Sequence, residues 1–296
     1  MNTLFSEIAR PPVMLIHGGA GPLPAEAEFE ERRRTFLRDL AHGVWPEVAA
    51  GQPALEAVTG IVERLEASPL FNAGFGAALQ SDGLARLSAS MMDGVRQKFS
   101  GVLLASHICH PIRLARVLQD RDESVLGPLG VQLLARELGI APENPATPER
   151  ARLWADYLEH KLPASSAGTV GAVVLDAEGR LAAATSTGGG RFNGPERISD
   201  SATVAGNYAS AYAAISCTGI GEHIIDDGLA VRLETLVREG LSVVEASERI
   251  YRDALARQRV YGWIAVDRRG AWAMCRTAEA MPCAAMSANR QAPLLG

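Results

Sequence analysis

One stretch of the chain decides the fold: Ser165-Ser166-Ala167-Gly168-Thr169-Val170-Gly171-Ala172-Val173-Val174-Leu175-Asp176. Small residues run up to Gly168, and Thr169 then begins an apolar segment that is typical of a buried strand. If the chain were cut before Thr169, that residue would carry both a hydroxyl nucleophile and a free α-amine. An α-amine has a pKa of about 7.7–8.0, so it can act as a general base at neutral pH. The stretch therefore predicts an amino-terminal threonine nucleophile, with a threonine that merely opens a strand as the alternative.

The pattern on both sides of this stretch predicts an α+β fold. Residues 170–175 and 181–185 flank a turn at 176–180 and predict a β-hairpin. The other strands are expected at 13–17, 85–92, 101–108, 204–206, 213–216, 262–266 and 271–275, and helices at 27–45, 53–66, 111–120, 126–138, 148–160, 221–238 and 242–257. Because the strands are apolar on both faces and few βαβ units are available, we expect a four-layer αββα sandwich, with two stacked, mainly antiparallel sheets flanked by helices.

Composition narrows the function classes. The chain has 296 residues, of which 47% are hydrophobic and 21% charged, which is ordinary for a soluble enzyme, and we expect a single domain. A net charge of −5 without a basic, aromatic-rich cluster argues against nucleic acid as a partner. No apolar run reaches membrane length and no secretory leader pattern is present, so we expect no membrane partner and a reduced, cytoplasmic setting.

Two segments need separate interpretation. Prolines interrupt residues 139–168 around one short helix, which predicts a linker that ends directly before Thr169. His107, Cys109 and His110 lie close together and suggest a metal site. Three ligands so closely spaced rarely form a closed site alone, however, and the adjacent Pro111 favours a strand end instead.

A hydroxyl cluster follows the second strand of the hairpin, at Thr185-Ser186-Thr187-Gly188-Gly189-Gly190. The glycines could cradle a phosphate, but the segment lacks the lysine of a P-loop and a GxGxxG motif. Antiparallel register would bring Thr187 back beside Thr169. Support for a nucleophile is therefore the favoured interpretation.

Two further motifs carry charge or backbone donors. Arg197 and Asp200 form a surface pair in the commonest case, whereas in a pocket they would bind the α-carboxylate and the α-ammonium of an amino acid. Thr218 and Gly219 lie where a strand meets a glycine turn and a helix. They could donate to an oxyanion, although an ordinary strand-to-helix turn is at least as common.

The order of these motifs resembles the plant-type asparaginases, also called isoaspartyl peptidases, of the N-terminal nucleophile hydrolase superfamily. The matching segments extend from residue 13 to about 285 and are Ile16-His17-Gly18-Gly19-Ala20-Gly21, Pro69-Leu70-Phe71-Asn72-Ala73-Gly74-Phe75-Gly76, Met92-Asp93-Gly94, Gly168-Thr169-Val170-Gly171-Ala172, Thr185-Ser186-Thr187-Gly188-Gly189, Arg197 with Asp200, and Ser216-Cys217-Thr218-Gly219-Ile220-Gly221-Glu222.

The resemblance implies a precursor that cuts itself between Gly168 and Thr169, giving an α chain of residues 1–168 and a β chain of residues 169–296 that pair as a homodimer of αβ units. It also implies a role for each matching residue. Thr169 would be the nucleophile, tuned by Thr187 and supported by Asn72; Arg197, Asp200 and the Gly221 carbonyl would bind the substrate; and Thr218 with Gly219 would form the oxyanion hole.

The resemblance further implies a structural sodium ion and no organic cofactor. The ion would be held by main-chain carbonyls of Leu65, Glu66, Ser68, Phe71, Ala73 and Phe75. Carbonyl oxygens suit such a hard cation.

The expected activity is hydrolysis of β-aspartyl dipeptides and of L-asparagine, both small molecules, to release L-aspartate. A glycosylasparaginase-like hydrolase and an unprocessed, non-enzymatic binding protein are the alternatives. Three departures from the family pattern bear on specificity and on the efficiency of the cut: Ser88 replaces an acidic residue, Ser199 stands where glycine is common, and the 190–196 segment is long and polar.

Overall fold

The predicted hairpin forms the centre of the larger sheet. Its strands β6 (Val170–Leu175) and β7 (Leu181–Thr187) pair antiparallel, and every residue in both is buried. Asp176 organises the turn between them, because its Oδ1 accepts hydrogen bonds from the backbone N–H groups of Glu178 and Arg180 at 3.0 and 2.9 Å. Gly179 supplies the left-handed residue of that turn, with φ of 79°.

The computed structural model describes residues 4–24, 26–160 and 168–296. Strands within those ranges form two sheets, of eight and five strands. In spatial order, the larger sheet contains β13 (Leu294–Leu295), β12 (Cys283–Ser287), β2 (Val13–His17), β6, β7, β3 (Leu87–Asp93), β4 (Lys98–Ala105) and β5 (Val125–Leu126). The smaller sheet contains β1 (Leu4–Ile8), β11 (Ala271–Arg276), β10 (Tyr261–Asp267), β9 (Ala213–Gly219) and β8 (Asn207–Ala209).

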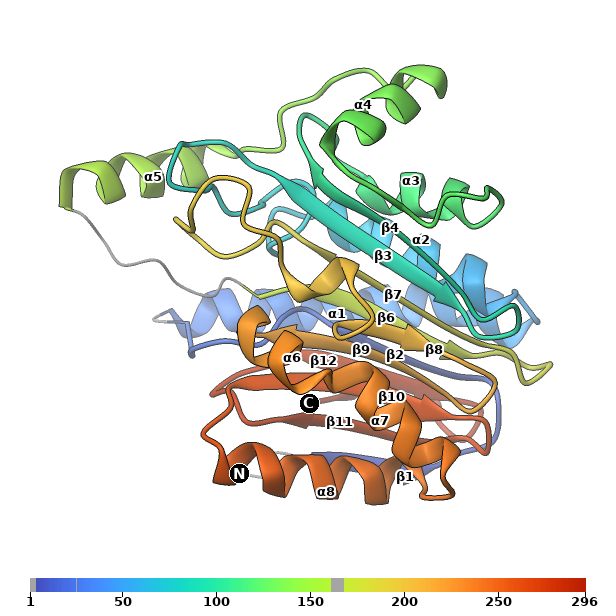
Figure 1. Cartoon of the computed structure of the whole chain (residues 1–296). Helices are drawn as coiled ribbons and strands as arrows, with labels where there is room; N and C mark the ends of the chain where they lie inside the picture. The colour runs from blue at the N-terminus through green and yellow to red at the C-terminus, as the bar shows by residue number, and fades with distance from the viewer. Residues whose placement is uncertain (1–3, 25, 161–167) are drawn as a thin grey trace.

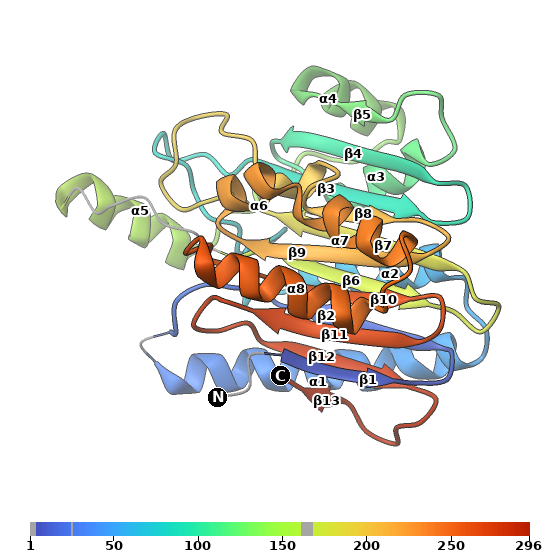
Figure 2. The same ribbon diagram turned by 60° about the horizontal axis from the view of Figure 1, so that its bottom comes forward.

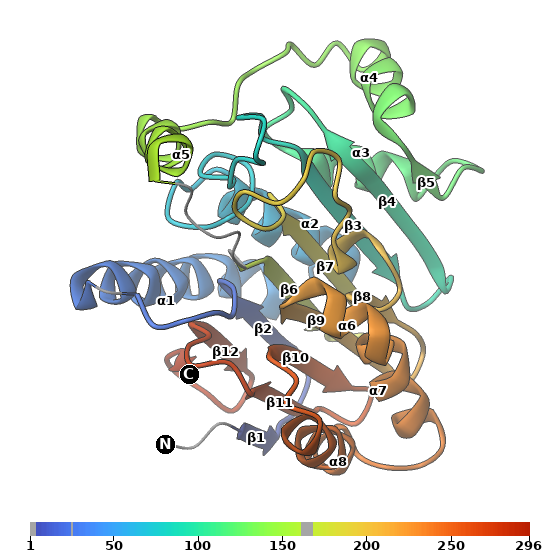
Figure 3. The ribbon, with the colours of Figure 1, turned by 60° about the vertical axis from the view of Figure 1, so that its left-hand side comes forward.

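Helices cover the outer face of each sheet (Figure 1). The larger sheet is covered by α1 (Ala27–Ala49), α2 (Ala54–Glu66), α3 (Pro111–Leu118) and α4 (Pro128–Glu137), and the smaller by α7 (Leu229–Arg238) and α8 (Val243–Ala256). Figure 2 looks onto α7 and α8 over the smaller sheet, and in Figure 3 α8 is seen nearly end-on, with α1 and α2 beyond the larger sheet. The inner faces meet where β9 contacts β6 and β7, which confirms the αββα sandwich.

Three apolar clusters separate the four layers. One lies between the larger sheet and its helices and includes Leu37 and Ile61. The second lies between the sheets and includes Val173 and Ile264, and the third lies beneath α7 and α8 and includes Trp263. Burial of each such side chain stabilises the fold by about 1.5–3 kcal/mol, so the layers hold the rims of both sheets in fixed relation.

Several predicted elements need correction. The single helix expected at 221–238 is two helices, α6 (Gly221–Asp227) and α7, because Gly228 is left-handed with φ of 55° and ends the first. The strand expected at 204–206 is β8, three residues later. The strand expected at 101–108 begins at Lys98 and ends at Ala105, and β1, β5, β12 and β13 were not predicted.

The predicted linker contains the helix expected there, α5 (Pro148–His160), which extends at the edge of the molecule in Figure 1. The rest of that prediction falls partly on residues 161–167, which lie outside the described residues. No helix in the described part of the chain is long and apolar enough to cross a membrane.

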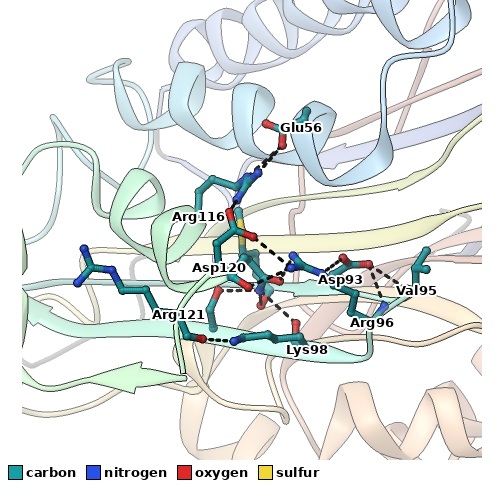
Figure 4. Close-up of polar contacts among 11 residues, drawn as sticks. Glu56, Asp93, Val95, Arg96, Lys98, Arg116, Asp120 and Arg121 are labelled. Carbon is teal, nitrogen blue, oxygen red and sulfur yellow. Dashed lines mark hydrogen bonds and ion pairs between the residues drawn. The ribbon is translucent and has the colours of Figure 1, made fainter. Parts of the chain in front are cut away.

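A network of charged side chains joins α2, α3 and the β3–β4 turn on the outer face (Figure 4). Asp120 accepts from Arg116 at 2.7 Å and from Arg96 at 3.1 Å. Arg96 also pairs with Asp93 at 2.7 Å, and Arg116 pairs with Glu56 at 2.8 Å. Each of these five charged side chains has an opposite partner within hydrogen-bond distance and is partly exposed to water.

Candidate active site

The candidate nucleophile lies at the rim of the larger sheet, where β6 begins and β7 ends. Thr169 is buried, and its hydroxyl donates to Thr187 Oγ1 at 3.2 Å. The pairing of Val170 with Ser186 causes this proximity, because the residues just outside that pair meet across the strand ends. The hairpin thus brings Thr187 to Thr169 as its register predicts.

The carbonyl of Gly168, which the predicted cut would attack, is held by two donors. Asn72 Nδ2 donates to it at 2.8 Å and Thr187 Oγ1 donates at 3.3 Å. The Asn72 side chain is itself fixed, since its Oδ1 accepts from Ala78 N at 2.7 Å. Two donors on one carbonyl oxygen draw electron density from its carbon and would stabilise negative charge on the oxygen.

Two glycines are required next to this bond, one within it and one packed against it. Gly168 has φ of +80°, a left-handed conformation that other residues rarely adopt. Gly19 approaches it so closely that a Cβ there would lie 2.9 Å from the Thr169 nitrogen. The loop after β2 therefore presses directly against the bond of interest, which explains the glycine-rich sequence at that point.

Thr218 and Gly219 end β9 in the facing sheet. Thr218 is fully buried, and its Oγ1 accepts from the backbone N–H of Ala20 at 2.8 Å, so its own hydroxyl proton is available for another acceptor. Gly219 has φ of +138°, and a Cβ there would lie 2.5 Å from Tyr261 Cα. Their role as an oxyanion hole stays a prediction.

Arg197 and Asp200 converge on the start of α6. A Cβ on Gly221 would lie 2.8 Å from Arg197 Nη2 and 2.8 Å from Asp200 Oδ1, so both side chains border the space over this glycine. The Arg197 guanidinium binds Glu222 Oε1 at 2.9 and 2.7 Å rather than Asp200. Asp200 is only 1% exposed, and the surface-pair alternative for these two residues is therefore wrong.

Asp200 is a buried carboxylate with unused capacity. Its Oδ1 accepts from Ser199 Oγ at 2.8 Å, whereas its Oδ2 has no hydrogen-bond partner among the described residues. Burial raises the pKa of Asp200 to about 6, against the opposing effects of the Ser199 hydrogen bond and the Arg197 charge. The serine that departs from the family pattern thus helps to hold this carboxylate.

Two groups near Thr169 had no role in the sequence-based prediction. Ser201 Oγ lies 3.5 Å from Thr169 Oγ1. Below the strand, His17 Nε2 lies 2.8 Å from Ser216 Oγ, which lies 2.7 Å from Thr185 Oγ1. Burial lowers the pKa of His17 to about 3, so the ring is neutral. The hydrogen-bonded series His17–Ser216–Thr185 is built from strands of both sheets, so no spacing in the sequence predicts it.

The carbonyls expected to hold a sodium ion lie at the end of α2 and in the loop that follows it. A helix end leaves its last carbonyls without intrahelical partners and carries partial negative charge, and Leu65 and Glu66 stand at that end. A Cβ on Gly74 would lie 2.1 Å from the Glu66 carbonyl oxygen, and one on Gly76 would lie 2.8 Å from that of Phe71. The Glu66 carbonyl already accepts from Phe75 N at 2.8 Å and the Leu65 carbonyl from Ser68 N at 3.2 Å, and the sodium site stays a prediction.

The metal alternative for the His107–His110 segment gains no support. Cys109 Sγ donates to the Glu143 carbonyl at 3.8 Å, and His110 Nδ1 lies 3.5 Å from Glu66 Oε2. Across residues 4–24, 26–160 and 168–296, no three His, Cys, Asp or Glu side chains are placed to hold a metal ion.

The sequence that forms the site at Gly168–Thr169 and over Gly221 is similar to those of known proteins. Residues 10–295 match the family described as asparaginase. The chain belongs to the asparaginase family. It is 41% identical over 285 residues to an isoaspartyl peptidase/L-asparaginase of Nostoc sp., covering 90% of this chain and 89% of that protein.

Relatives from other lineages give the same family. An isoaspartyl peptidase of Salmonella typhimurium is 39% identical over 292 residues, covering 91% of this chain and 93% of the relative. A plant-type L-asparaginase of Pyrobaculum calidifontis is 36% identical over 285 residues, covering 90% of this chain and 94% of the relative. The resemblance found in the sequence motifs is thereby confirmed over nearly the whole chain.

The remaining departures from the family pattern have structural partners. Ser88 is buried opposite Thr187 in the β3–β7 pairing, and its Oγ accepts from Leu104 N at 3.2 Å. The 190–196 segment is anchored to the loop after α2, because Phe192 N donates to the Leu79 carbonyl at 2.9 Å. The Ser88 hydroxyl therefore joins β3 to β4, and the long segment is held in a defined position.

Proposed function

We propose that this member of the asparaginase family is an autoprocessing threonine amidohydrolase that releases L-aspartate from β-aspartyl dipeptides and from L-asparagine. The observation that carries the proposal is the Thr169 hydroxyl beside the Gly168 carbonyl, which Asn72 and Thr187 already hold by hydrogen bonds. The names of the relatives support the same reaction class.

In the proposed maturation, Thr169 Oγ attacks the Gly168 carbonyl carbon. The new C–O bond forms, the C–N bond breaks, and the released α-amine of Thr169 takes up the hydroxyl proton. Asn72 and Thr187 stabilise the oxyanion that forms on the way. Water then hydrolyses the ester, which leaves a carboxylate on Gly168 and restores the Thr169 hydroxyl. The chains 1–168 and 169–296 remain associated.

In the proposed turnover, the substrate is held by the residues over Gly221. Its α-carboxylate displaces the exposed Glu222 from Arg197, and its α-ammonium donates to Asp200 Oδ1, the oxygen that borders Gly221, and to the Gly221 carbonyl. The Thr169 amine accepts the hydroxyl proton as Oγ attacks the side-chain carbonyl, and Thr218 and Gly219 stabilise the oxyanion. The protonated leaving amine departs, and water hydrolyses the β-aspartyl ester.

Three properties complete the proposal. Paired αβ units would form a homodimer, and the setting would be cytoplasmic. A sodium ion would be held by the main-chain carbonyls of the loop after α2, at the residues that the resemblance implies. The ion would supply only positive charge that fixes the loop carrying Asn72.

The maturation step is tested by denaturing gel and intact mass. The purified protein should give two chains with the masses of residues 1–168 and 169–296, and Thr169→Ala should give one uncut chain. Thr169→Ser keeps a hydroxyl and is the matched control that should still be cut. A wild-type protein that stays at full length would refute autoprocessing and favour the unprocessed, non-enzymatic alternative.

The activity is tested by aspartate release from β-Asp-Leu and from L-asparagine, measured side by side on the mature protein. We expect release from both, and none by the Thr169→Ala protein. Aspartate release from neither substrate, by a protein that has been cut, would overturn the assigned reaction.

A further inference from the structure

A cavity of about 410 Å³ adjoins the candidate cleavage site. Gly168, Asn72 and Ala20 line it, and the Ala20 N–H binds the hydroxyl of Thr218. Among the described residues that line this cavity, none belongs to the group around Gly221. The cavity therefore lies beside the Gly168–Thr169 bond and is lined by other residues than the proposed aspartyl pocket.

Three arginines line the cavity, and two of them lack a carboxylate partner. Arg33 pairs with Glu30 at 3.1 Å. Arg150 donates from Nε to the Gly76 carbonyl at 2.8 Å, but neither Arg150 nor Arg191 lies within 4.0 Å of a carboxylate in the described ranges. Positions 1–3, 25 and 161–167 contain no Asp or Glu, so the rest of the chain adds no carboxylate that could form an ion pair with them.

Arg191 is held in place by the segment that departs from the family pattern. Its neighbour Phe192 is buried and stacks on Tyr157 of α5, with ring centroids 4.3 Å apart. Arg191 Nε is buried without a hydrogen-bond partner among the described residues. A buried guanidinium N–H that lacks an acceptor destabilises the protein unless a ligand supplies one.

The charges act on each other. Burial, and then the positive charge of Arg191, lower the pKa of Arg150; the charge of Glu149 opposes them, and Arg33 adds a smaller lowering. The other charged lining residues, Glu26 and Glu149, are exposed to water, where their effect is screened. The interior of the cavity thus has an excess of positive charge that favours an anion.

We propose that this cavity binds the α-carboxylate of the leaving amino acid of a β-aspartyl dipeptide, with Arg150 and Arg191 as its donors. The inference rests on the proposed function. The aspartyl part would lie over Gly221, whereas the cavity begins at Gly168 and Asn72, beside the bond to Thr169, so the leaving amino acid would occupy the cavity. Asparagine releases ammonia, which has no carboxylate, so only the dipeptide makes this contact.

The test compares β-Asp-Leu with β-Asp-leucinamide, which differ only in the carboxylate. Wild type should have a kcat/KM for the acid roughly 10-fold to 100-fold above that for the amide, as expected for a charge-assisted contact. Arg191→Gln and Arg150→Gln should each bring this ratio towards one. Because both substrates are measured on the same protein, partial misfolding cancels from the ratio.

Arg152→Gln is the matched control on α5. Arg152 is exposed, does not line the cavity and contacts the Pro148 carbonyl at 3.4 Å, so the wild-type ratio should persist. Equal kcat/KM for acid and amide in wild type would overturn the inference while leaving the proposed function intact. A preference that survives in both Arg191→Gln and Arg150→Gln would also overturn it. Aspartate release from neither compound would overturn the proposed function, and this inference with it.

Discussion

Asp200 and Asp120 each lie near arginine, but the protein treats the two carboxylates in opposite ways. Asp120 is 60% exposed, and each of its oxygens accepts from an arginine (Figure 4). Asp200 is 1% exposed and keeps one oxygen without a partner among the described residues. The neighbouring arginines lower the pKa of Asp120, whereas burial raises that of Asp200 to about 6.

The difference distinguishes a carboxylate that stabilises the fold from a carboxylate that can bind a ligand. A charge that is paired in water stabilises the fold slightly and offers nothing to a ligand. A buried charge with a free lone pair destabilises the fold and can be compensated by a ligand that donates to it. Loss of charge should therefore impair activity at the inner site and have only a small effect on stability at the outer network.

The largest effect should come from Arg197→Ala. Loss of the guanidinium removes the charge-assisted contacts to the substrate α-carboxylate, so kcat/KM for β-Asp-Leu should fall by about 100-fold or more. The cut before Thr169 should persist, because neither donor to the Gly168 carbonyl changes. Kinetics and a denaturing gel measure the two effects.

Arg232→Ala is the matched control for this loss. Arg232 pairs with Asp253 at 2.7 Å on the outer helices, and its removal should leave both readouts close to wild type. If Arg197→Ala also prevented the cut, Arg197 would be a structural residue. The loss of activity would then not show that the inner site binds substrate.

Asp200→Asn should have an intermediate effect, with opposite signs for activity and stability. Because the folded pKa is above the ordinary value of 3.8, folding favours the protonated form, and stability from this group is lost as pH rises from about 4 to about 6. Above that window the variant should be more stable than its parent by up to roughly 3 kcal/mol. Aspartate release should fall steeply, because an amide attracts an ammonium poorly.

Thermal unfolding should be compared in the Thr169→Ala background, where the chain stays uncut. The gain in melting temperature from Asp200→Asn should be largest near pH 8 and small near pH 4. A variant less stable than its parent at pH 8 would show that the Asp200 charge is already compensated. Asp200 would then not differ from Asp120 in the way described above.

The sequence specifies the inner layers better than the edges. The β6–β7 hairpin could be predicted because Asp176 and Gly179 mark its turn and because both strands are short apolar runs. Strand β12 could not, because its stability comes from pairing with β2, about 270 residues earlier in the chain. The break at Gly228 had a local signal, an Asp-Asp-Gly sequence that a continuous helical pattern outweighed.

The candidate site was predictable to the extent that chain neighbours define it. Register places Thr187 beside Thr169, and that follows from the sequence. The meeting of Arg197 and Asp200 over Gly221 depends on how a loop packs against α6, for which spacing alone favours a surface pair. The His17–Ser216 contact joins the two sheets and had no signal at all. Contacts between layers are thus the part that sequence patterns leave open.

The smallest effect should come from Asp120→Asn, the outer counterpart of Asp200→Asn. Here the folded pKa is lowered, so the stability from this group is present above the ordinary pKa and is lost as pH falls below it. Near pH 8 the variant should therefore be less stable than its parent by no more than about 1 kcal/mol, since exposed pairs are screened by water. Thermal unfolding in the same Thr169→Ala background should show a loss of stability that shrinks further in about 0.5 M salt.

Aspartate release by the processed Asp120→Asn protein should stay at the wild-type rate. If Asp120→Asn instead destabilised the protein by several kcal/mol irrespective of salt, the outer network would be as critical as a buried site, and exposure would not be what distinguishes the two aspartates.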